Sequence, residues 1–172
     1  MDRLKEYKVA HRGLAEGTHS FEFEMNDDFF DCFEATRGTH GLVRAEVRIV
    51  KSALLMEVRM RMAGSVKAVC DRCLGEMDLP VSGEMSLYVK QGKGEEDDGD
   101  ADFILLAQDA DYLDLSEPLY ELYMLSIPMR VTHPEGGCDP EMERVLKAYT
   151  EEKNDKTDPR WEELKKLINN NK

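Results

Sequence analysis

Long apolar runs are missing from this sequence. Its apolar stretches are short, like the five residues Phe103–Ala107, whereas a helix needs about 18 to 20 apolar residues to cross a membrane. The first residues, Met-Asp-Arg-Leu-Lys-Glu-Tyr-Lys, have no apolar stretch behind their charges, unlike a secretory signal. We therefore expect a cytoplasmic protein that does not enter a membrane.

Basic residues are also few. Lys and Arg number 23 against 36 Asp and Glu, so the formal net charge is -13 at pH 7. This balance argues against a nucleic-acid binder, because phosphate contacts use Lys and Arg. The negative charge is not spread evenly along the sequence. Between Arg44 and Arg72, the sequence has seven bases and only three acids. That segment is either a solvated sheet face of long charged side chains or a surface that contacts phosphates.

Strand patterns fill the first two thirds of the chain. Apolar and polar residues alternate over 21–25, 42–50 and 54–62, which is the period of a half-buried β-strand. Gly64 is expected to end the third of these strands, and shorter strands are expected at 65–70, 78–82, 85–89 and 103–106. Because no helical crossover interrupts the run, an antiparallel meander or open barrel is favoured over a parallel sheet.

Helix signals begin after an acidic, glycine-containing linker at 91–102. Ser116 is expected to cap a helix that has Pro118 in its first turn and ends before Pro128. Further helices are expected at 140–150 and, loosely ordered, at 158–172. The predicted fold class is α+β, an antiparallel β-sheet or open barrel followed by C-terminal helices, in a single domain over residues 1–172.

Cysteine is scarce, and a disulfide framework is not expected in a reducing cytosol. Cys32 stands among phenylalanines and is expected to be a small core residue. Cys70-Asp-Arg-Cys73 is the sharpest local motif, because two cysteines at a tight turn can bind one metal ion. No helix pattern follows it, which argues against a thioredoxin-like redox pair.

A zinc site would need two more ligands. Cys138 and His133 are the candidates, on a glycine-rich loop, and together with Cys70 and Cys73 they form a chemically sensible zinc set. The alternative is that these residues hold a turn without a metal. Motifs for nucleophilic catalysis, phosphate cradling or metalloprotease chemistry are lacking, so no catalytic residue is predicted.

Several weak motifs occur in a telling order. They are Val66-Lys-Ala-Val-Cys-Asp-Arg-Cys-Leu, the acidic linker, Asp114-Leu-Ser-Glu-Pro-Leu-Tyr-Glu-Leu, Leu125-Ser-Ile-Pro, a Cys-bearing loop and Asp158-Pro-Arg-Trp-Glu-Glu-Leu-Lys-Lys-Leu. This order resembles the bacterial YceD family, also called large ribosomal RNA subunit accumulation protein, over residues 42–167. Some relatives complete the first CxxC with a second one, whereas this chain has His133 and Cys138 there.

The resemblance implies a ribosome-assembly factor for accumulation or processing of large-subunit (23S) ribosomal RNA, acting by binding rather than catalysis. Two partners stay open. One is pre-ribosomal RNA, contacted through Arg44, Arg48, Arg59, Arg61, Lys67 and Arg72. The other is a basic large-subunit ribosomal protein held by the acidic surfaces. No small-molecule substrate is identified, and a small zinc-binding or thiol-dependent enzyme that uses the CxxC turn is the alternative function.

Overall fold

The computed structural model describes residues 3–33, 40–92, 103–107 and 109–154. Their contacts divide the chain into two compact units. The first unit is Met1–Val69 with Glu76–Val131, and the second is Cys70–Gly75 with Thr132–Lys172. Most of the predicted acidic linker and all of the helix predicted at 158–172 lie outside the described residues. No helix in the described ranges has the length and apolar character that would span a membrane.

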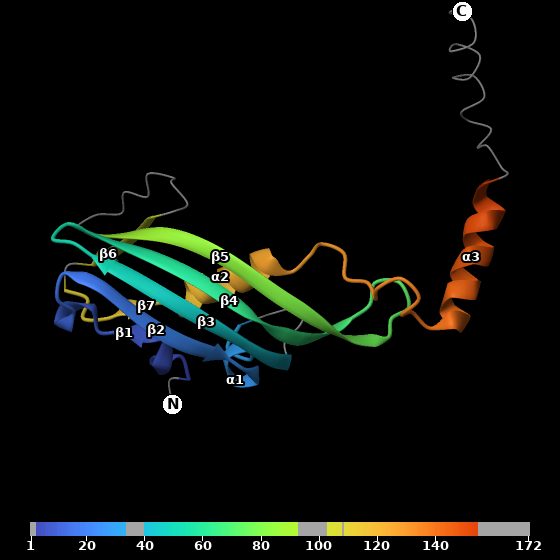
Figure 1. Cartoon of the computed structure of the whole chain (residues 1–172), viewed down its shortest axis with the longest axis horizontal. Helices are drawn as coiled ribbons and strands as arrows, with labels where there is room; N and C mark the ends of the chain where they lie inside the picture. Colours follow the sequence, from blue (N-terminus) through green and yellow to red (C-terminus); the bar gives the residue numbers. More distant parts are fainter. Residues whose placement is uncertain (1–2, 34–39, 93–102, 108, 155–172) are drawn as a thin grey trace, which may run out of the picture. The chain divides into compact units, whose positions relative to one another are not determined.

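A five-stranded sheet forms most of the first unit (Figure 1). Its strands are β2 (Gly17–Met25), β3 (His40–Lys51), β4 (Leu55–Val69), β5 (Glu76–Gly92) and β6 (Phe103–Ala107), in that order across the sheet. The first four are antiparallel neighbours, while β6 runs parallel to β5. The α+β class is therefore confirmed, but the sheet is mixed rather than a purely antiparallel meander.

Two glycines that look like strand ends lie inside long strands. The sequence analysis ended a strand at Gly64, yet β4 continues through it. A Cβ at Gly64 would lie 2.6 Å from the Cα of Val43 on β3, so glycine permits a close approach of two backbones. Likewise β5 is one strand across Gly83 instead of two short ones, and a Cβ there would lie 3.2 Å from Leu122 of the covering helix.

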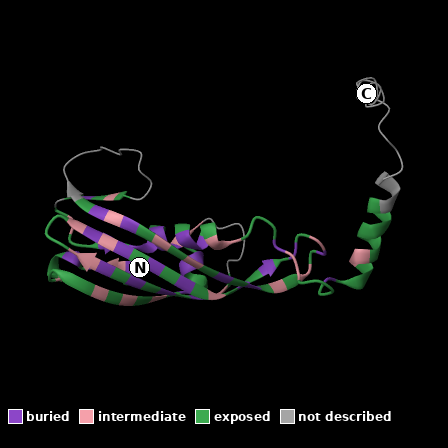
Figure 2. Ribbon diagram, turned by 45° about the horizontal axis from the view of Figure 1, so that its top comes forward, coloured by how far each residue is buried: buried purple, intermediate pink, exposed green. Residues whose placement is uncertain are grey.

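One face of the sheet is buried and the other is exposed, as the alternating colours along the strands in Figure 2 show. The helices α1 (Asp27–Phe30) and α2 (Ser116–Ser126) contribute Phe30 and Tyr123 to the core, and these two rings pack with centroids 4.6 Å apart. A small second sheet pairs β1 (Lys8–Val9) with β7 (Leu113–Asp114). The strand period thus places the charged side chains of β2 to β5 together on the exposed face.

Two local predictions in this unit are wrong. Cys32 is exposed rather than in the core, and its Sγ donates a hydrogen bond to the carbonyl of Asp28 at 3.2 Å. Ser116 is the first residue of α2 instead of its cap. The carboxylate of Asp114 accepts hydrogen bonds from the Ser116 amide (3.0 Å) and hydroxyl (2.6 Å) at this helix start. A carboxylate at the positive end of a helix is also favourable electrostatically.

The second unit consists of two loops and the helix α3 (Pro140–Asn154). Asp139 precedes the helix, and its Oδ1 accepts a hydrogen bond from the amide of Glu141 at 2.9 Å. Pro140 follows at the first helical position, where the missing N–H costs nothing. The helix start predicted from the Asp-Pro pair is therefore confirmed, and the helix runs four residues beyond its predicted end.

Candidate metal centre and nucleic-acid interface

A tight turn positions the first pair of thiols. The Leu74 amide donates to the Cys70 carbonyl and the Cys70 amide donates to the Gly75 carbonyl, both at 2.9 Å. Leu74 takes a positive φ of 58° to complete the turn, a conformation that is uncommon for a residue with a side chain. The amide of Arg72 points at the Cys70 Sγ at 3.4 Å. The turn therefore brings both sulfurs to its inside and supplies a backbone donor to one of them.

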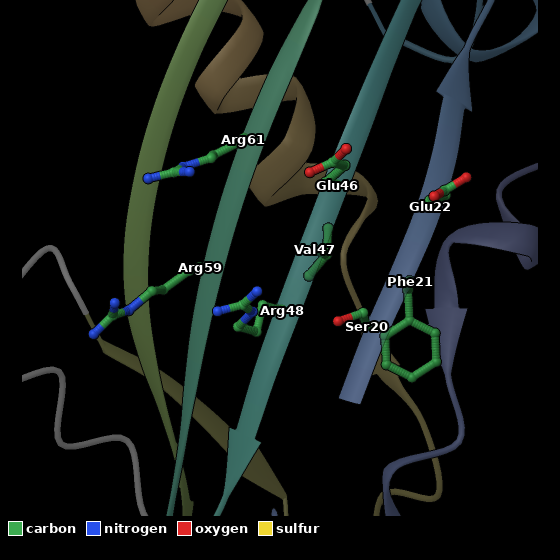
Figure 3. Close-up of a pocket in the computed structure, with 8 residues that line it drawn as sticks. All are labelled: Ser20, Phe21, Glu22, Glu46, Val47, Arg48, Arg59 and Arg61. Atoms are coloured by element: carbon green, nitrogen blue, oxygen red, sulfur yellow. The ribbon is translucent and has the colours of Figure 1, made fainter. Parts of the chain in front are cut away.

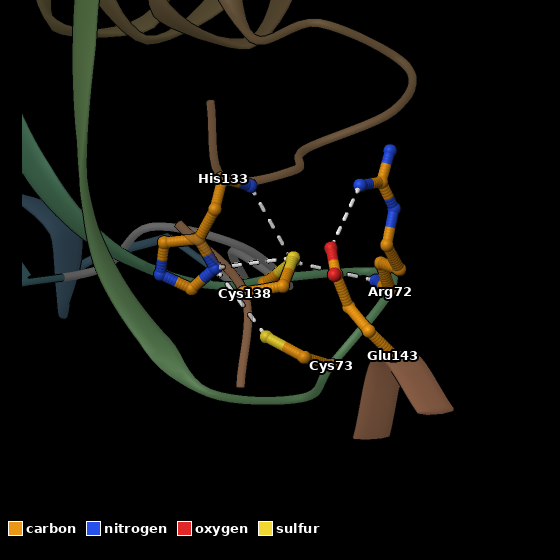
Figure 4. Close-up of polar contacts among 6 residues, drawn as sticks. Arg72, Cys73, His133, Cys138 and Glu143 are labelled. Carbon is orange, nitrogen blue, oxygen red and sulfur yellow. Dashed lines mark hydrogen bonds and ion pairs between the residues drawn. The ribbon is translucent and has the colours of Figure 1, made fainter. Parts of the chain in front are cut away.

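A second loop brings the other two donors to the same place (Figure 4). The Sγ of Cys138 lies 3.8 Å from the Sγ of Cys70, and the Nδ1 of His133 lies 3.4 Å from the Sγ of Cys73 and 3.9 Å from that of Cys138. All four donor atoms lie within 4.8 Å of one another. The structure thus gathers residues that are 60 or more positions apart in the sequence.

These distances fit a tetrahedral ion. With zinc–sulfur bonds of about 2.3 Å, the edge between two sulfurs of a tetrahedron is about 3.8 Å, and an edge between sulfur and a ring nitrogen is slightly shorter. The three cysteines are buried, and three thiolates with one imidazole are a common structural zinc set. The cluster can therefore hold a metal ion, and its ligand chemistry favours zinc.

The surroundings prepare some of these thiols for ionisation. Burial raises the pKa of Cys70, but hydrogen bonds from the backbone amides of Cys73, His133 and Arg72 outweigh it and lower the pKa overall. Hydrogen bonds from the amides of Asp139 and Gly75 lower the pKa of Cys73. Burial, followed by the neighbouring thiols, raises the pKa of Cys138. Of the three thiols, Cys138 is therefore the one whose surroundings favour the protonated form.

Arg72, one of the predicted RNA-binding residues, belongs to this second unit. Its guanidinium lies 3.7 Å from the carboxylate of Glu143 on α3. The contact ties the CxxC turn to the start of the helix that follows Cys138. Both side chains are partly exposed, so the ion pair contributes little to stability, about 0–1 kcal/mol.

The other five predicted RNA-binding residues all lie on the exposed face of the sheet in the first unit, and we call this surface the open face. Its cations from β3 to β5 are Arg44, Arg48, Arg59, Arg61, Lys67 and Lys90. Its acids from β2 to β5 are Glu22, Glu24, Glu46, Glu57, Glu76, Asp78 and Glu84. The excess of bases along residues 44–72 is thus offset by acids from the neighbouring strands β2 and β5.

Most of these cations have a carboxylate partner. Arg44 pairs with Glu24 at 3.0 Å, Arg61 with Glu84 at 3.1 Å, and Lys67 with Asp78 at 2.6 Å. Arg59 pairs with Glu57, two residues before it on the same strand, at 2.7 Å. Glu24, Asp78 and Glu84 lie outside the segment that was counted in the sequence analysis, because they become neighbours of these cations only through the strand register.

Arg48 differs from the other arginines. It lies directly across from Arg59 in the β3–β4 register, and no carboxylate within the described ranges pairs with it. Figure 3 shows both arginines, with Arg61, around a hollow of the open face that Glu22 and Glu46 also line. Like charges directly opposite each other are unfavourable, and an anion bound between them would relieve that repulsion.

The fold and the site together define an α+β protein with a thiol-rich cluster that could hold a metal ion. A comparison with protein families matches residues 58–168 to the family described as "Large ribosomal RNA subunit accumulation protein YceD". The match covers more than half of the chain, so the chain belongs to the YceD family, and this supports a ribosome-related role. No curated protein matches the chain significantly. No solved structure matches it either.

Proposed function

We propose that this chain supports accumulation of large-subunit (23S) ribosomal RNA in the cytoplasm as an assembly factor, by binding pre-ribosomal RNA rather than by catalysis. The family match supports the process. Arg48 and Arg59, which face each other on neighbouring strands, support direct contact with RNA, because two guanidinium groups on one surface can bind a phosphate chain. This arginine pair is the observation that carries the RNA part of the proposal.

The remaining cations take a secondary part. Arg44, Arg61, Lys67 and Arg72 have carboxylate partners, as Arg59 does in Glu57, so a phosphate must compete with a carboxylate for each of them, and only Arg48 is without one in the described part of the chain. Acids across much of the open face oppose non-specific attraction of nucleic acid. This distribution favours a limited RNA contact around Arg48 and Arg59 over general binding to polyanions.

Zinc in this proposal has a structural role. Four protein donors fill a tetrahedral ion, whereas a catalytic zinc keeps a position open for water or substrate. Cys70, Cys73, His133 and Cys138 would therefore hold the two loops of the second unit together. A closed site of this kind favours a binding protein over the alternative of a small zinc or thiol enzyme.

The proposal is tested with two matched variants of the open face. The Arg48→Gln/Arg59→Gln variant removes the opposed pair, in which only Arg59 has a carboxylate partner, and the Arg44→Gln/Lys67→Gln variant removes the same charge from two cations that both have one. We expect the first variant to lower the slope of log K against log salt for single-stranded RNA by about 1.4, because each phosphate contact contributes about 0.7. We expect the control to change it less.

The same variants are compared in cells that lack their own copy of the gene. The first variant should restore less mature large-subunit ribosomal RNA than the control does. Equal affinity and equal RNA levels in both variants would refute direct contact through this pair. Binding of the wild-type chain to a Lys- and Arg-rich ribosomal protein, without affinity for RNA, would instead show that the acidic surfaces are the functional ones.

A further inference from the structure

An aromatic pair lies on the open face at the β5–β6 edge. Tyr88 and Phe103 are register partners, and their ring centroids are 5.5 Å apart with 30° between the planes. The Nζ of Lys90 lies 4.5 Å from the centroid of the Phe103 ring. Phe103 is 41% exposed and Leu105 beside it is 45% exposed. Phe103 and Leu105 thus face solvent on a sheet surface that also carries many charged side chains.

Positive charge gathers around this pair. The three cross-strand rows at this end of the open face contain Lys90, Arg48 and Arg59 as cations, with Glu57 as their acid. The next row holds the acids Glu22, Glu46 and Glu84 around Arg61. The near balance of charge over the whole open face therefore hides a basic end, and the aromatic pair lies within it.

We infer that Tyr88 and Phe103 form a stacking site for the bases of single-stranded RNA. This inference rests on the proposed function and names the form of RNA that is bound. Exposed aromatic rings on a sheet, next to basic residues, are the combination by which proteins bind single strands, because bases stack on the rings while phosphates meet the cations. Paired bases of a duplex are stacked within the helix and cannot reach the rings.

The side chains around Phe103 suit such a ligand. The ammonium of Lys90 covers the ring, but it is carried on a flexible four-carbon stem. An incoming base displaces it, and the freed ammonium can pair with an adjacent phosphate. Arg59 and Arg48 lie one row away, about 7 Å along the strands, and they are also two and three strands across from β6, about 10 and 14 Å. A single strand of a few nucleotides can therefore stack one base on the ring and place a phosphate further along on the arginine pair.

The test uses the full chain and a single-stranded RNA about 12 nucleotides long, within the range that single-strand-binding folds cover. Phe103→Leu keeps the apolar surface and removes the ring, and Phe103→Tyr keeps the ring. Tyr112→Leu is the matched control, because Tyr112 is 57% exposed and lies outside the five-stranded sheet. We expect Phe103→Leu to weaken binding roughly 5- to 100-fold, while Phe103→Tyr and Tyr112→Leu bind like the wild type.

Two further measurements isolate stacking. An abasic strand of equal length and charge should bind the wild type more weakly than the normal strand does, and it should bind the Phe103→Leu variant equally weakly. A 2-aminopurine placed in the strand should be quenched on binding to the wild type and less on binding to Phe103→Leu. Circular dichroism and the melting temperature of each variant confirm that it is folded.

The outcomes separate this inference from the proposed function. If Phe103→Leu binds like the wild type while Arg48→Gln/Arg59→Gln loses salt-dependent affinity, the stacking site is refuted and the RNA-binding proposal stands. Equal affinity of the wild type for single-stranded and duplex RNA also refutes the stacking site. Binding of an Arg- and Lys-rich peptide with no affinity for RNA refutes both.

Discussion

Replacing Gly64 with alanine should weaken the pairing of β3 with β4, where Gly64 lies opposite Val43. An alanine Cβ would lie 2.6 Å from the Cα of Val43 and 3.0 Å from the carbonyl carbon of Leu42, and it would also clash with the Leu42 oxygen. Ordinary van der Waals contact begins at 3.4 Å. The two backbones must therefore separate by about 1.1 Å, because the Leu42 oxygen is the nearest atom, and no flexible side chain is present to absorb the shift.

The cost can be bounded from two opposing effects. Overpacking of this kind costs about 1–3 kcal/mol of the free energy of unfolding. Alanine also reduces the conformational freedom of the unfolded chain, and this stabilises the folded protein by about 0.4–1 kcal/mol. The net destabilisation is then between about 0 and 2.6 kcal/mol, and its midpoint of about 1.3 kcal/mol lowers the melting temperature of a chain of this size by about 3–5 °C. Urea unfolding followed by circular dichroism measures the free energy directly.

Gly13→Ala is the matched control. A Cβ at Gly13 would meet no atom within 4 Å, and its φ is not in the left-handed region. This variant should be neutral or slightly more stable than the wild type, since only the effect on the unfolded chain remains. Equal unfolding free energies for Gly64→Ala and Gly13→Ala would refute the close approach of β3 and β4 as the reason for glycine at position 64.

The remaining predictions concern the metal centre and the start of α2. The wild type should bind one zinc ion and Cys138→Ser should bind it much more weakly, whereas Cys32→Ser, which changes an exposed thiol outside the cluster, should bind like the wild type by metal analysis after dialysis. Because the pKa of Cys138 is raised, zinc must displace its proton, so apparent affinity should rise with pH and calorimetry in buffers of different ionisation enthalpy should detect proton release. Asp114→Ala should cost about 1 kcal/mol in urea unfolding, because the Ser116 amide loses its acceptor.

The sequence predicts the strands better than it predicts where they end. Alternation over 42–50 identifies the buried and exposed sides of β3 correctly, because a half-buried strand imposes that period on its side chains. Gly64 and Gly83 look like strand ends, since glycine weakens a strand interior. Glycine occurs at these positions because another element comes close to the backbone there. That element is β3 at Gly64 and α2 at Gly83. Such an approach is visible only once the partner is in place.

The four candidate metal ligands could be chosen from the sequence because ligand chemistry is carried by residue type. Few side chains other than cysteine and histidine offer sulfur or imidazole, so Cys70, Cys73, His133 and Cys138 could be selected without knowing their positions. Residue type did not predict in the same way whether a cysteine is exposed. Cys32 stands in an apolar stretch of sequence but is exposed after α1, because neighbours along the chain do not decide burial at the end of a short helix.

The ion pairs and the aromatic pair on the open face depend on the strand register. The register cannot be read from the amino-acid composition. Arg44 and Glu24 are 20 residues apart and form an ion pair because β2 and β3 are aligned in one particular way. Tyr88 and Phe103 become neighbours because β6 lies parallel to β5, an arrangement that the strand pattern did not predict. A shift of one residue in either register would move the side chains of one strand to the other face. The basic, aromatic end of the open face is therefore a product of strand pairing, and variants that remove its rings or its arginine pair test that arrangement directly.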